Sequence, residues 1–194
     1  MKIKTLISLL ILIIVIASCE ESYTPKPRGY IRIELPEKSY VSFDSTFPYK
    51  FEYPAYAKLS SPKEASDQPY MLNIDIPKFK ATLFLTYKAV NGNIATYLED
   101  NHVFLTRHIS KASAIDESVV ASEEHNVWGA IYSISGSGAA SPIQFFVTDS
   151  STNFLRGALY FNVVPNNDSL APVIDFIQKD ITHLIETIEW KKNH

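Results

Sequence analysis

Histidine and carboxylate side chains are the first candidates for chemistry in this sequence of 194 residues. Asp180, His183 and Glu186 recur at a spacing that places them on one face of a helix, where they could provide two or three metal ligands. Zinc takes tetrahedrally arranged ligands that usually come from more than one element. Charge patterning on the surface of an amphipathic helix explains the same spacing, so we expect no metal site.

Other catalytic groupings are also weak. Glu123-Glu124 is a pair of sequence neighbours in a polar segment, whereas a general acid and base need carboxyl groups that converge from separate elements. Gly136-Ser137-Gly138 lacks the spacing of a nucleophile elbow, and the 6 glycines form no phosphate-binding loop. His102 lies on the apolar side of a predicted helix, where a core or interface histidine is the simpler interpretation. The sequence therefore predicts no catalytic residue and no cofactor.

The single cysteine has a clearer role. Residues 6–17 are apolar except for one serine and follow two lysines, which is the pattern of a secretion signal. This apolar run is too short for a confident membrane span. The run ends at Ile16-Ala17-Ser18-Cys19, which resembles the lipobox of bacterial lipoproteins. The resemblance implies cleavage before Cys19 and acylation of its thiol and new amino group, because several acyl chains hold a protein durably on a membrane. We predict a signal peptide over residues 1–18; an ordinary signal peptide with a cysteine near the cut is the alternative.

Composition excludes several classes of protein. The chain has 18 basic and 21 acidic side chains, and removal of residues 1–18 takes away two of the lysines. This balance lacks the basic footprint of a nucleic-acid-binding protein, and one cysteine cannot support a disulfide scaffold. Residues 19–29 contain Pro25 and Pro27 and predict a short extended tether. The length of the remainder, residues 30–194, suits a single domain.

The pattern of that domain predicts strands, a helix, more strands and a closing helix. The first helix is expected over residues 94–113, and the closing one has apolar residues from Leu170 to Ile188 at i, i+3, i+4 and i+7, with Ser169 as its cap and Pro172 in its first turn. Alternating or β-branched segments predict strands over residues 30–35, 49–53, 71–76, 81–90, 118–121, 127–135, 143–148 and 154–164. Consecutive strands favour an α+β sandwich, a mainly antiparallel sheet packed by two helices.

Aromatic residues are dense between Tyr23 and Tyr70, in a part of the chain that is also rich in proline. Tyrosine and phenylalanine alternate with polar residues there, so one buried face does not accommodate all of them. Exposed aromatic side chains of this type often belong to protein interfaces. Packing beneath the proline-rich loops is an equally weighted alternative.

Several longer segments of the mature chain stand out as motifs. They are Thr24-Pro25-Lys26-Pro27-Arg28-Gly29-Tyr30 with residues 31–36, Phe51-Glu52-Tyr53-Pro54, Thr148-Asp149-Ser150, residues 153–162 and residues 183–190. In this order, and over most of the mature chain, they resemble the gliding-motility lipoprotein GldD family of Bacteroidota. Some members of the family have a cysteine at the position of Phe47, so a structural thiol at this position is not a general feature of the family. The resemblance implies an envelope lipoprotein needed for gliding and for the associated type IX secretion apparatus. It carries no catalytic residues to transfer.

We therefore expect a lipid-anchored, non-catalytic interaction or assembly module, held in the outer membrane and facing the periplasm. Its expected partners are other gliding and secretion proteins of the envelope, and not nucleic acid. The candidate partner-binding residues are Arg28, Tyr30, Tyr53 and Arg156, the two arginines being bidentate-capable donors. For Arg156, a structural salt bridge to Asp149 across a hairpin is the favoured interpretation. The alternative functions are a ligand-binding domain with a pocket between sheet and helix, and a hydrolase with an unrecognised composite site.

Overall fold

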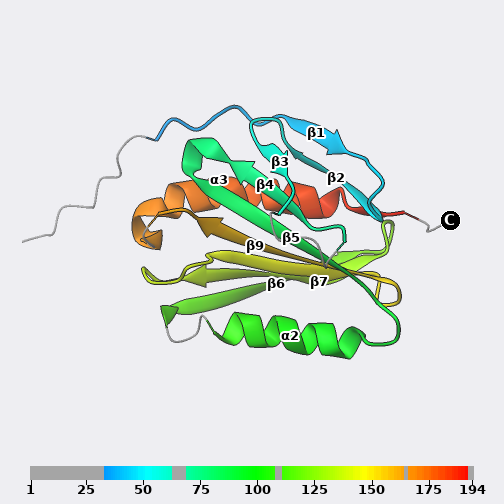
Figure 1. Ribbon diagram of the computed structural model, residues 1–194. Helices are drawn as coiled ribbons and strands as arrows, with labels where there is room; N and C mark the ends of the chain where they lie inside the picture. Colours follow the sequence, from blue (N-terminus) through cyan, green and yellow to red (C-terminus); the bar gives the residue numbers. More distant parts are fainter. Residues whose placement is uncertain (1–32, 63–68, 108–110, 164–165, 192–194) are drawn as a thin grey trace, which may run out of the picture. The chain divides into compact units, whose positions relative to one another are not determined.

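The computed structural model describes residues 33–62, 69–107, 111–163 and 166–191, all of which belong to one compact unit (Figure 1). The predicted signal peptide, Cys19, the tether, Arg28 and Tyr30 lie outside the described residues. No helix among the described residues has the length and apolarity needed to cross a membrane.

The main layer is an antiparallel sheet of seven strands in the order β3-β4-β5-β9-β8-β7-β6. The strands are β3 (Lys58–Ser60), β4 (Leu72–Ile76), β5 (Ala81–Ala89), β6 (Ala114–Ser122), β7 (Val127–Ser135), β8 (Ile143–Thr148) and β9 (Asn153–Phe161), with a 3-10 turn η2 (Pro77–Phe79) between β4 and β5. The central strands β8 and β9 are buried along most of their length. Side chains alternate between the two faces of a strand, so burial at successive positions means that both faces are covered.

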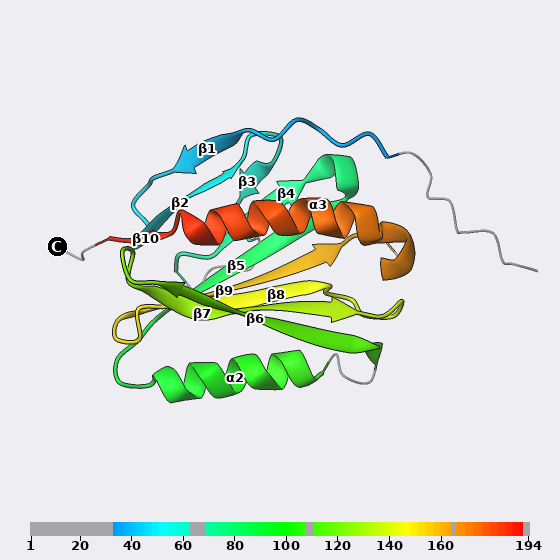
Figure 2. The same cartoon turned by 180° about the vertical axis from the view of Figure 1, so that it is seen from behind.

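One face of the sheet packs against α3 (Asn167–Glu186). Leu83 of β5 and Ile74 of β4 lie on this face and line one small cavity together with Ile177, Ile181 and Leu184 of the helix. The apolar stripe predicted for the closing helix is thus the stripe that is buried, while Asp175, Lys179 and Glu186 on its polar side are exposed. Figure 2 shows α3 lying across this face of the sheet.

A small second sheet lies beside α3. It has the order β1-β2-β10 and consists of β1 (Tyr40–Phe43), β2 (Tyr49–Pro54) and β10 (Glu189–Trp190), all antiparallel. Tyr49 and Phe51 of β2 are 0% and 2% exposed and belong to the hydrophobic core. The second sheet therefore extends the core beyond the main sheet.

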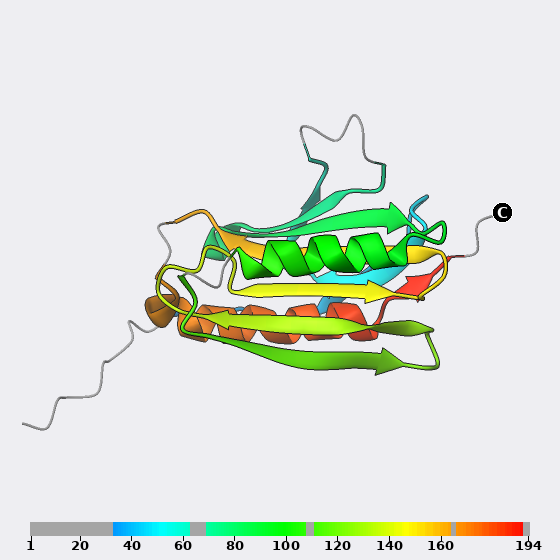
Figure 3. The same ribbon diagram turned by 90° about the horizontal axis from the view of Figure 1, so that it is seen from below.

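The other face of the main sheet packs against α2 (Ile94–Thr106), which runs along the strands with α3 beyond them (Figure 3). Arg156 of β9 and Lys88 of β5 lie on this face. Tyr97 of α2 contacts Phe154 of β9 with ring centroids 5.6 Å apart. The two helices on opposite faces, with the second sheet beside α3, confirm the predicted α+β sandwich.

Details of α2 differ from the sequence prediction. The helix ends at Thr106 within the described residues, short of the predicted 113. Leu98 is 38% exposed and His102 is exposed, so His102 is not a core histidine, whereas Asn101 is 4% exposed. Apolar spacing selected the wrong face because α2 packs through Tyr97 and Asn101.

Other element boundaries also differ. Residues 33–35 of the strand predicted over 30–35 have no regular structure, and β1, β3 and β10 were not predicted. The closing helix starts at Asn167 because Asn166, not Ser169, is its N-cap. The Asn166 side chain accepts a hydrogen bond from the backbone N–H of Ser169, which satisfies one of the free donors of the first turn. Pro172 accordingly lies in the second turn.

Candidate functional site

Asp180 on α3 is a carboxylate that is only 3% exposed. It accepts hydrogen bonds from the ammonium group of Lys38 (2.6 Å), the hydroxyl of Tyr40 (2.9 Å) and the hydroxyl of Tyr56. Lys38 also donates to the carbonyl of Phe176 (3.0 Å), and its ammonium lies 3.6 Å from the centroid of the Phe176 ring. The buried charge is thus paired and hydrogen-bonded, which burial requires.

The surroundings of Asp180 hold both tyrosines in their protonated form. Burial and the hydrogen bond to Asp180 raise the pKa of Tyr40 to about 12. The same two causes raise the pKa of Tyr56 well above its usual range. Both hydroxyls therefore remain donors at neutral pH, and the cluster is a joint between α3 and the segments around β1 and β2.

This finding corrects the interpretation of Asp180, His183 and Glu186 as surface charge patterning. Glu186 is exposed, but Asp180 is buried and His183 is half-buried against β2. In the part of the chain that the structure describes, no three histidine, cysteine or acidic residues are grouped so as to hold a metal ion.

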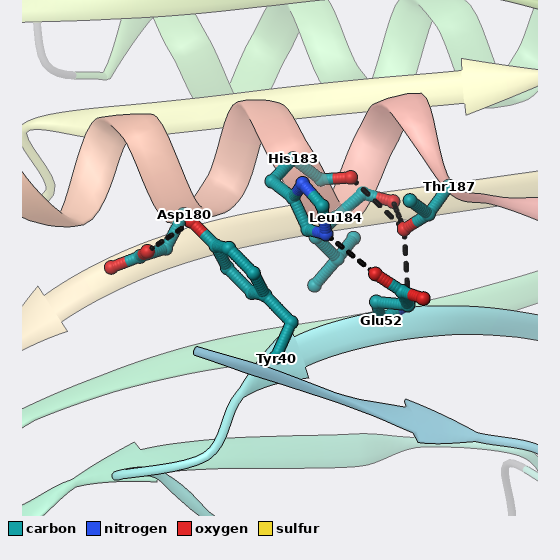
Figure 4. A network of polar contacts seen from close by, with 6 residues as sticks. All are labelled: Tyr40, Glu52, Asp180, His183, Leu184 and Thr187. Carbon is teal, nitrogen blue, oxygen red and sulfur yellow. Dashed lines mark hydrogen bonds and ion pairs between the residues drawn. The ribbon is translucent and has the colours of Figure 1, made fainter. Parts of the chain in front are cut away.

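His183 forms a second joint, next to the first (Figure 4). Its Nε2 lies 2.7 Å from Oε2 of Glu52 on β2, and the Tyr40 ring stacks on the imidazole with centroids 3.7 Å apart. The backbone N–H of Glu52 donates to the Thr187 hydroxyl (3.0 Å), which lies within hydrogen-bond distance of the carbonyls of His183 (2.9 Å) and Leu184 (3.1 Å). These contacts fix β2 to the C-terminal end of α3, where free carbonyls need donors.

Arg156 does not pair with Asp149, contrary to the sequence interpretation. Its Nη2 donates to Oε1 of Gln144 (2.7 Å), and its guanidinium carbon lies 4.7 Å from the centroid of the Phe104 ring. The register places Arg156 opposite Phe146, so its side chain points to the α2 face and away from the hairpin turn. Arg156 instead lines a cavity of about 310 Å³ between α2 and the sheet.

The carboxylate of Asp149 is hydrogen-bonded within the turn between β8 and β9. Its carboxylate accepts hydrogen bonds from the backbone N–H groups of Ser151 (3.0 Å), Thr152 (2.7 Å) and Asn153 (2.8 Å), and from the Asn153 amide (2.7 Å). Burial favours a raised pKa, but the hydrogen bonds from Thr152, Asn153 and Ser151 outweigh it and hold the pKa of Asp149 well below its usual range.

The aromatic residues of β1, β2 and their flanks pack inward. Tyr53 is half-buried, and its ring lies edge-on to that of Phe51 with centroids 6.4 Å apart. Phe43, Phe47 and Tyr53 are partly buried against the core. For Phe43 and Phe47, packing is the correct one of the two interpretations that the sequence left open, whereas half-buried Tyr53 stays a candidate partner-binding residue.

The β6 edge of the main sheet is a feature that sequence reasoning missed. Strand β6 pairs with β7 and, among the described residues, with no other strand. Its Val119 is 82% exposed, and a groove of about 570 Å³ lies between β6 and α3, reaching Ile185. The sequence signal for this edge is the apolar pair Val119-Val120 in an otherwise polar segment. Val120 packs against the core, so that only Val119 marks the exposed strand.

These features define a class of protein: an α+β sandwich whose buried charges join its layers and whose main sheet ends in the long, exposed edge strand β6. The chain belongs to the gliding motility lipoprotein GldD family, whose family model matches residues 20–190. This confirms the resemblance seen in the sequence, and it makes the protein a lipoprotein and a component of gliding motility.

The chain is similar to the solution structure of cyanobacterial PsbP (CyanoP) from Synechocystis sp. PCC 6803, with a TM-score of 0.48 and 10% identity, over 82% of this chain and 97% of that one. A search of curated proteins gave no match.

Proposed function

We propose that the protein is a non-catalytic assembly module of the gliding apparatus and of the type IX secretion apparatus associated with it. Acylated Cys19 anchors it in the outer membrane, and its folded part faces the periplasm. Membership of the gliding motility lipoprotein family supports the first part of this proposal. The observation that carries the assembly role is the exposed edge strand β6.

An exposed edge strand presents unpaired backbone N–H and C=O groups, and proteins usually protect such edges. Strand β6 is nine residues long and mostly exposed, and Val119 projects an apolar side chain from it. A partner segment that adds to β6 as another strand would satisfy these backbone groups and cover Val119.

The charge around this edge indicates the chemistry of the partner. The exposed acidic side chains of β6 and of the turn after it are Asp116, Glu117, Glu123 and Glu124. None of the four forms an ion pair with another described residue. A basic, extended segment of another envelope protein is complementary to this edge.

The state of the buried carboxylates supports a structural over a catalytic role. A catalytic acid or base needs a free proton-transfer position next to substrate. Asp180 and Asp149 each accept at least three hydrogen bonds from the protein's own groups. The alternative of a hydrolase has no comparable observation behind it, whereas the cavity beside Arg156 favours ligand binding as a second role.

Site-specific crosslinking in intact gliding cells tests the assembly role. A photoreactive residue replaces Val119 in the full acylated chain, and the control position is Lys58, which is exposed on β3 at the opposite edge of the same sheet. We expect position 119, and not position 58, to crosslink to a discrete gliding or secretion protein. We also expect Val119→Glu to impair gliding without lowering the melting temperature. Normal gliding by Val119→Glu together with no product specific to position 119 would refute the assigned surface.

A further inference from the structure

The cavity between α2 and the main sheet has polar and aromatic walls. Its volume is about 310 Å³, at the lower end of the range of about 300–1,000 Å³ for small-molecule sites. Residues of β5 and β9 line it on one side and residues of α2 on the other; Figure 3 shows α2 lying along these strands. The lining residues that matter here are Lys88, Tyr97, Asn101, Phe104, Phe154 and Arg156.

Three buried polar groups at this place have no hydrogen-bond partner within the protein. Asn101 lines the cavity from α2, is only 4% exposed, and has an Oδ1 without a partner. Nε of Arg156 and Nε2 of Gln144, its hydrogen-bond partner, are the other two. Leaving such a group unsatisfied costs about 1–3 kcal/mol. One more buried side-chain atom of the described residues, Oδ1 of Asn73, is in the same condition. Two of these atoms thus belong to residues that line the cavity, and a third belongs to the hydrogen-bond partner of Arg156.

The charge of the cavity favours an anion. Arg156 forms no ion pair with any described residue, and burial lowers the pKa of its guanidinium. A guanidinium in this position is a charge that the protein itself does not neutralise. Lys88 brings a second cation to the lining and Asp100 one carboxylate, so a single negative charge balances the site.

The apolar part of the lining indicates what accompanies that charge. Tyr97 and Phe154 form one aromatic wall, with ring centroids 5.6 Å apart, and Phe104 covers the guanidinium of Arg156. Aromatic side chains of this kind bind apolar or aromatic groups. A bare inorganic anion would leave these walls without contact.

We propose that this cavity binds a small carboxylate with an apolar or aromatic body, its carboxylate on Arg156 and its body against Tyr97, Phe104 and Phe154. Arginine suits this task because its planar fork matches the geometry of a carboxylate. Lys88 adds a second favourable charge. This role is independent of partner binding at β6, which lies at the edge of the sheet.

The test uses the full acylated protein in a non-ionic detergent, with 4-phenylbutyrate as the probe. Its neutral amide, 4-phenylbutyramide, and inorganic phosphate are the comparison compounds, and calorimetry measures each affinity. We expect phenylbutyrate to bind and the amide and phosphate to bind about tenfold more weakly or not at all. Tighter binding of phosphate than of phenylbutyrate, or no binding of phenylbutyrate, would overturn the proposal.

Two arginines provide a matched pair of variants. Arg107 also lies over the Phe104 ring, at 5.3 Å, but is exposed and does not line the cavity. We expect Arg156→Gln to weaken phenylbutyrate binding by about tenfold or more, and Arg107→Gln to leave it unchanged. Equal affinities in the two variants would refute the site. If Arg156→Gln does not fold, Asn101→Phe takes its place, because the larger ring occupies part of the cavity and keeps the charge of Arg156; undiminished binding by Asn101→Phe then counts against the proposal.

Discussion

The ammonium group of Lys38 lies 2.6 Å from Oδ1 of Asp180, although the two residues are 142 positions apart in the chain. Lys38 precedes β1, and Asp180 lies in the third quarter of α3. The lysine is 27% exposed and the aspartate 3%, so the pair lies where the small sheet meets the helix. The second sheet is consequently attached to α3 by a specific polar contact as well as by apolar packing.

Replacing Asp180 with alanine should lower the free energy of unfolding by about 3 kcal/mol. The change leaves Lys38, Tyr40 and Tyr56 without their common acceptor. Urea unfolding followed by circular dichroism measures the loss. The control is Asp175→Ala, an exposed position on the same helix, which should change stability by less than about 0.5 kcal/mol. Equal effects of the two substitutions would show that the joint contributes nothing.

Asp149 should make the protein less stable in acid. Because its pKa in the folded protein lies below the value of about 4 in the unfolded chain, its contribution is complete above that pH. The contribution decreases as the pH falls below about 4 towards the folded-state pKa. Asp149→Asn should cost about 2 kcal/mol at pH 7 and should reduce the slope of stability against pH between about 4 and 2. Denaturant titrations at several pH values measure both effects, and an unchanged slope would contradict this role.

The sequence predicted what depends on local periodicity. The stripe from Val173 to Ile185 in α3 is buried as expected, because an apolar repeat of 3.6 residues has to cover an apolar face. Strands β5, β7 and β8 were predicted closely for the corresponding reason, since each has alternating or β-branched residues. The fold class followed from the order of these elements.

The sequence could not predict what depends on distant partners. Asp180 resembles a surface residue until Lys38, Tyr40 and Tyr56, each more than a hundred positions away, come within hydrogen-bond distance. The sequence favours a salt bridge between Arg156 and Asp149 because the two residues flank one hairpin, but strand alternation directs the arginine side chain towards α2. The cavity beside it depends on how α2 rests on the sheet, and no local pattern encodes that arrangement.

Gly157 should not tolerate even a methyl group. It lies opposite Phe145 in the β8–β9 pair, and a Cβ at this position would overlap the ring of that fully buried phenylalanine. Gly157→Ala should therefore lower the free energy of unfolding by about 2 kcal/mol or more. Gly138→Ala is the control, since a Cβ there makes only ordinary contacts, 3.6 Å from the Lys111 side chain. Partial rescue of Gly157→Ala by Phe145→Leu would assign the loss to this overlap; a stability equal to that of Gly138→Ala would exclude it.

Cys19→Ala should remove the lipid anchor while leaving the folded domain intact. Without the thiol, acylation at Cys19 cannot take place, and durable attachment through several acyl chains is lost. We expect the variant to lose incorporation of labelled fatty acid and to leave the outer-membrane fraction, with loss of gliding through mislocalisation. Thermal unfolding of the variant should match that of the parent protein. Full retention in the outer membrane would disprove anchoring through this residue.

Arg28 and Tyr30 follow the proposed anchor closely in sequence and remain candidates for contact with a partner. If they act at such an interface and not in the packing of the fold, Arg28→Ala with Tyr30→Ala should impair gliding and leave the melting temperature within about 1–2 °C, as substitutions outside a packed core do. The control is Lys26→Ala with Thr24→Ala, two changes in the same predicted tether, which should leave gliding normal. A fall in melting temperature of about 5 °C or more would mean that Arg28 and Tyr30 stabilise the fold, since a shift of that size corresponds to more than about 1 kcal/mol. In that case the loss of gliding would follow from unfolding, and partner contact would have to be assigned to β6 alone.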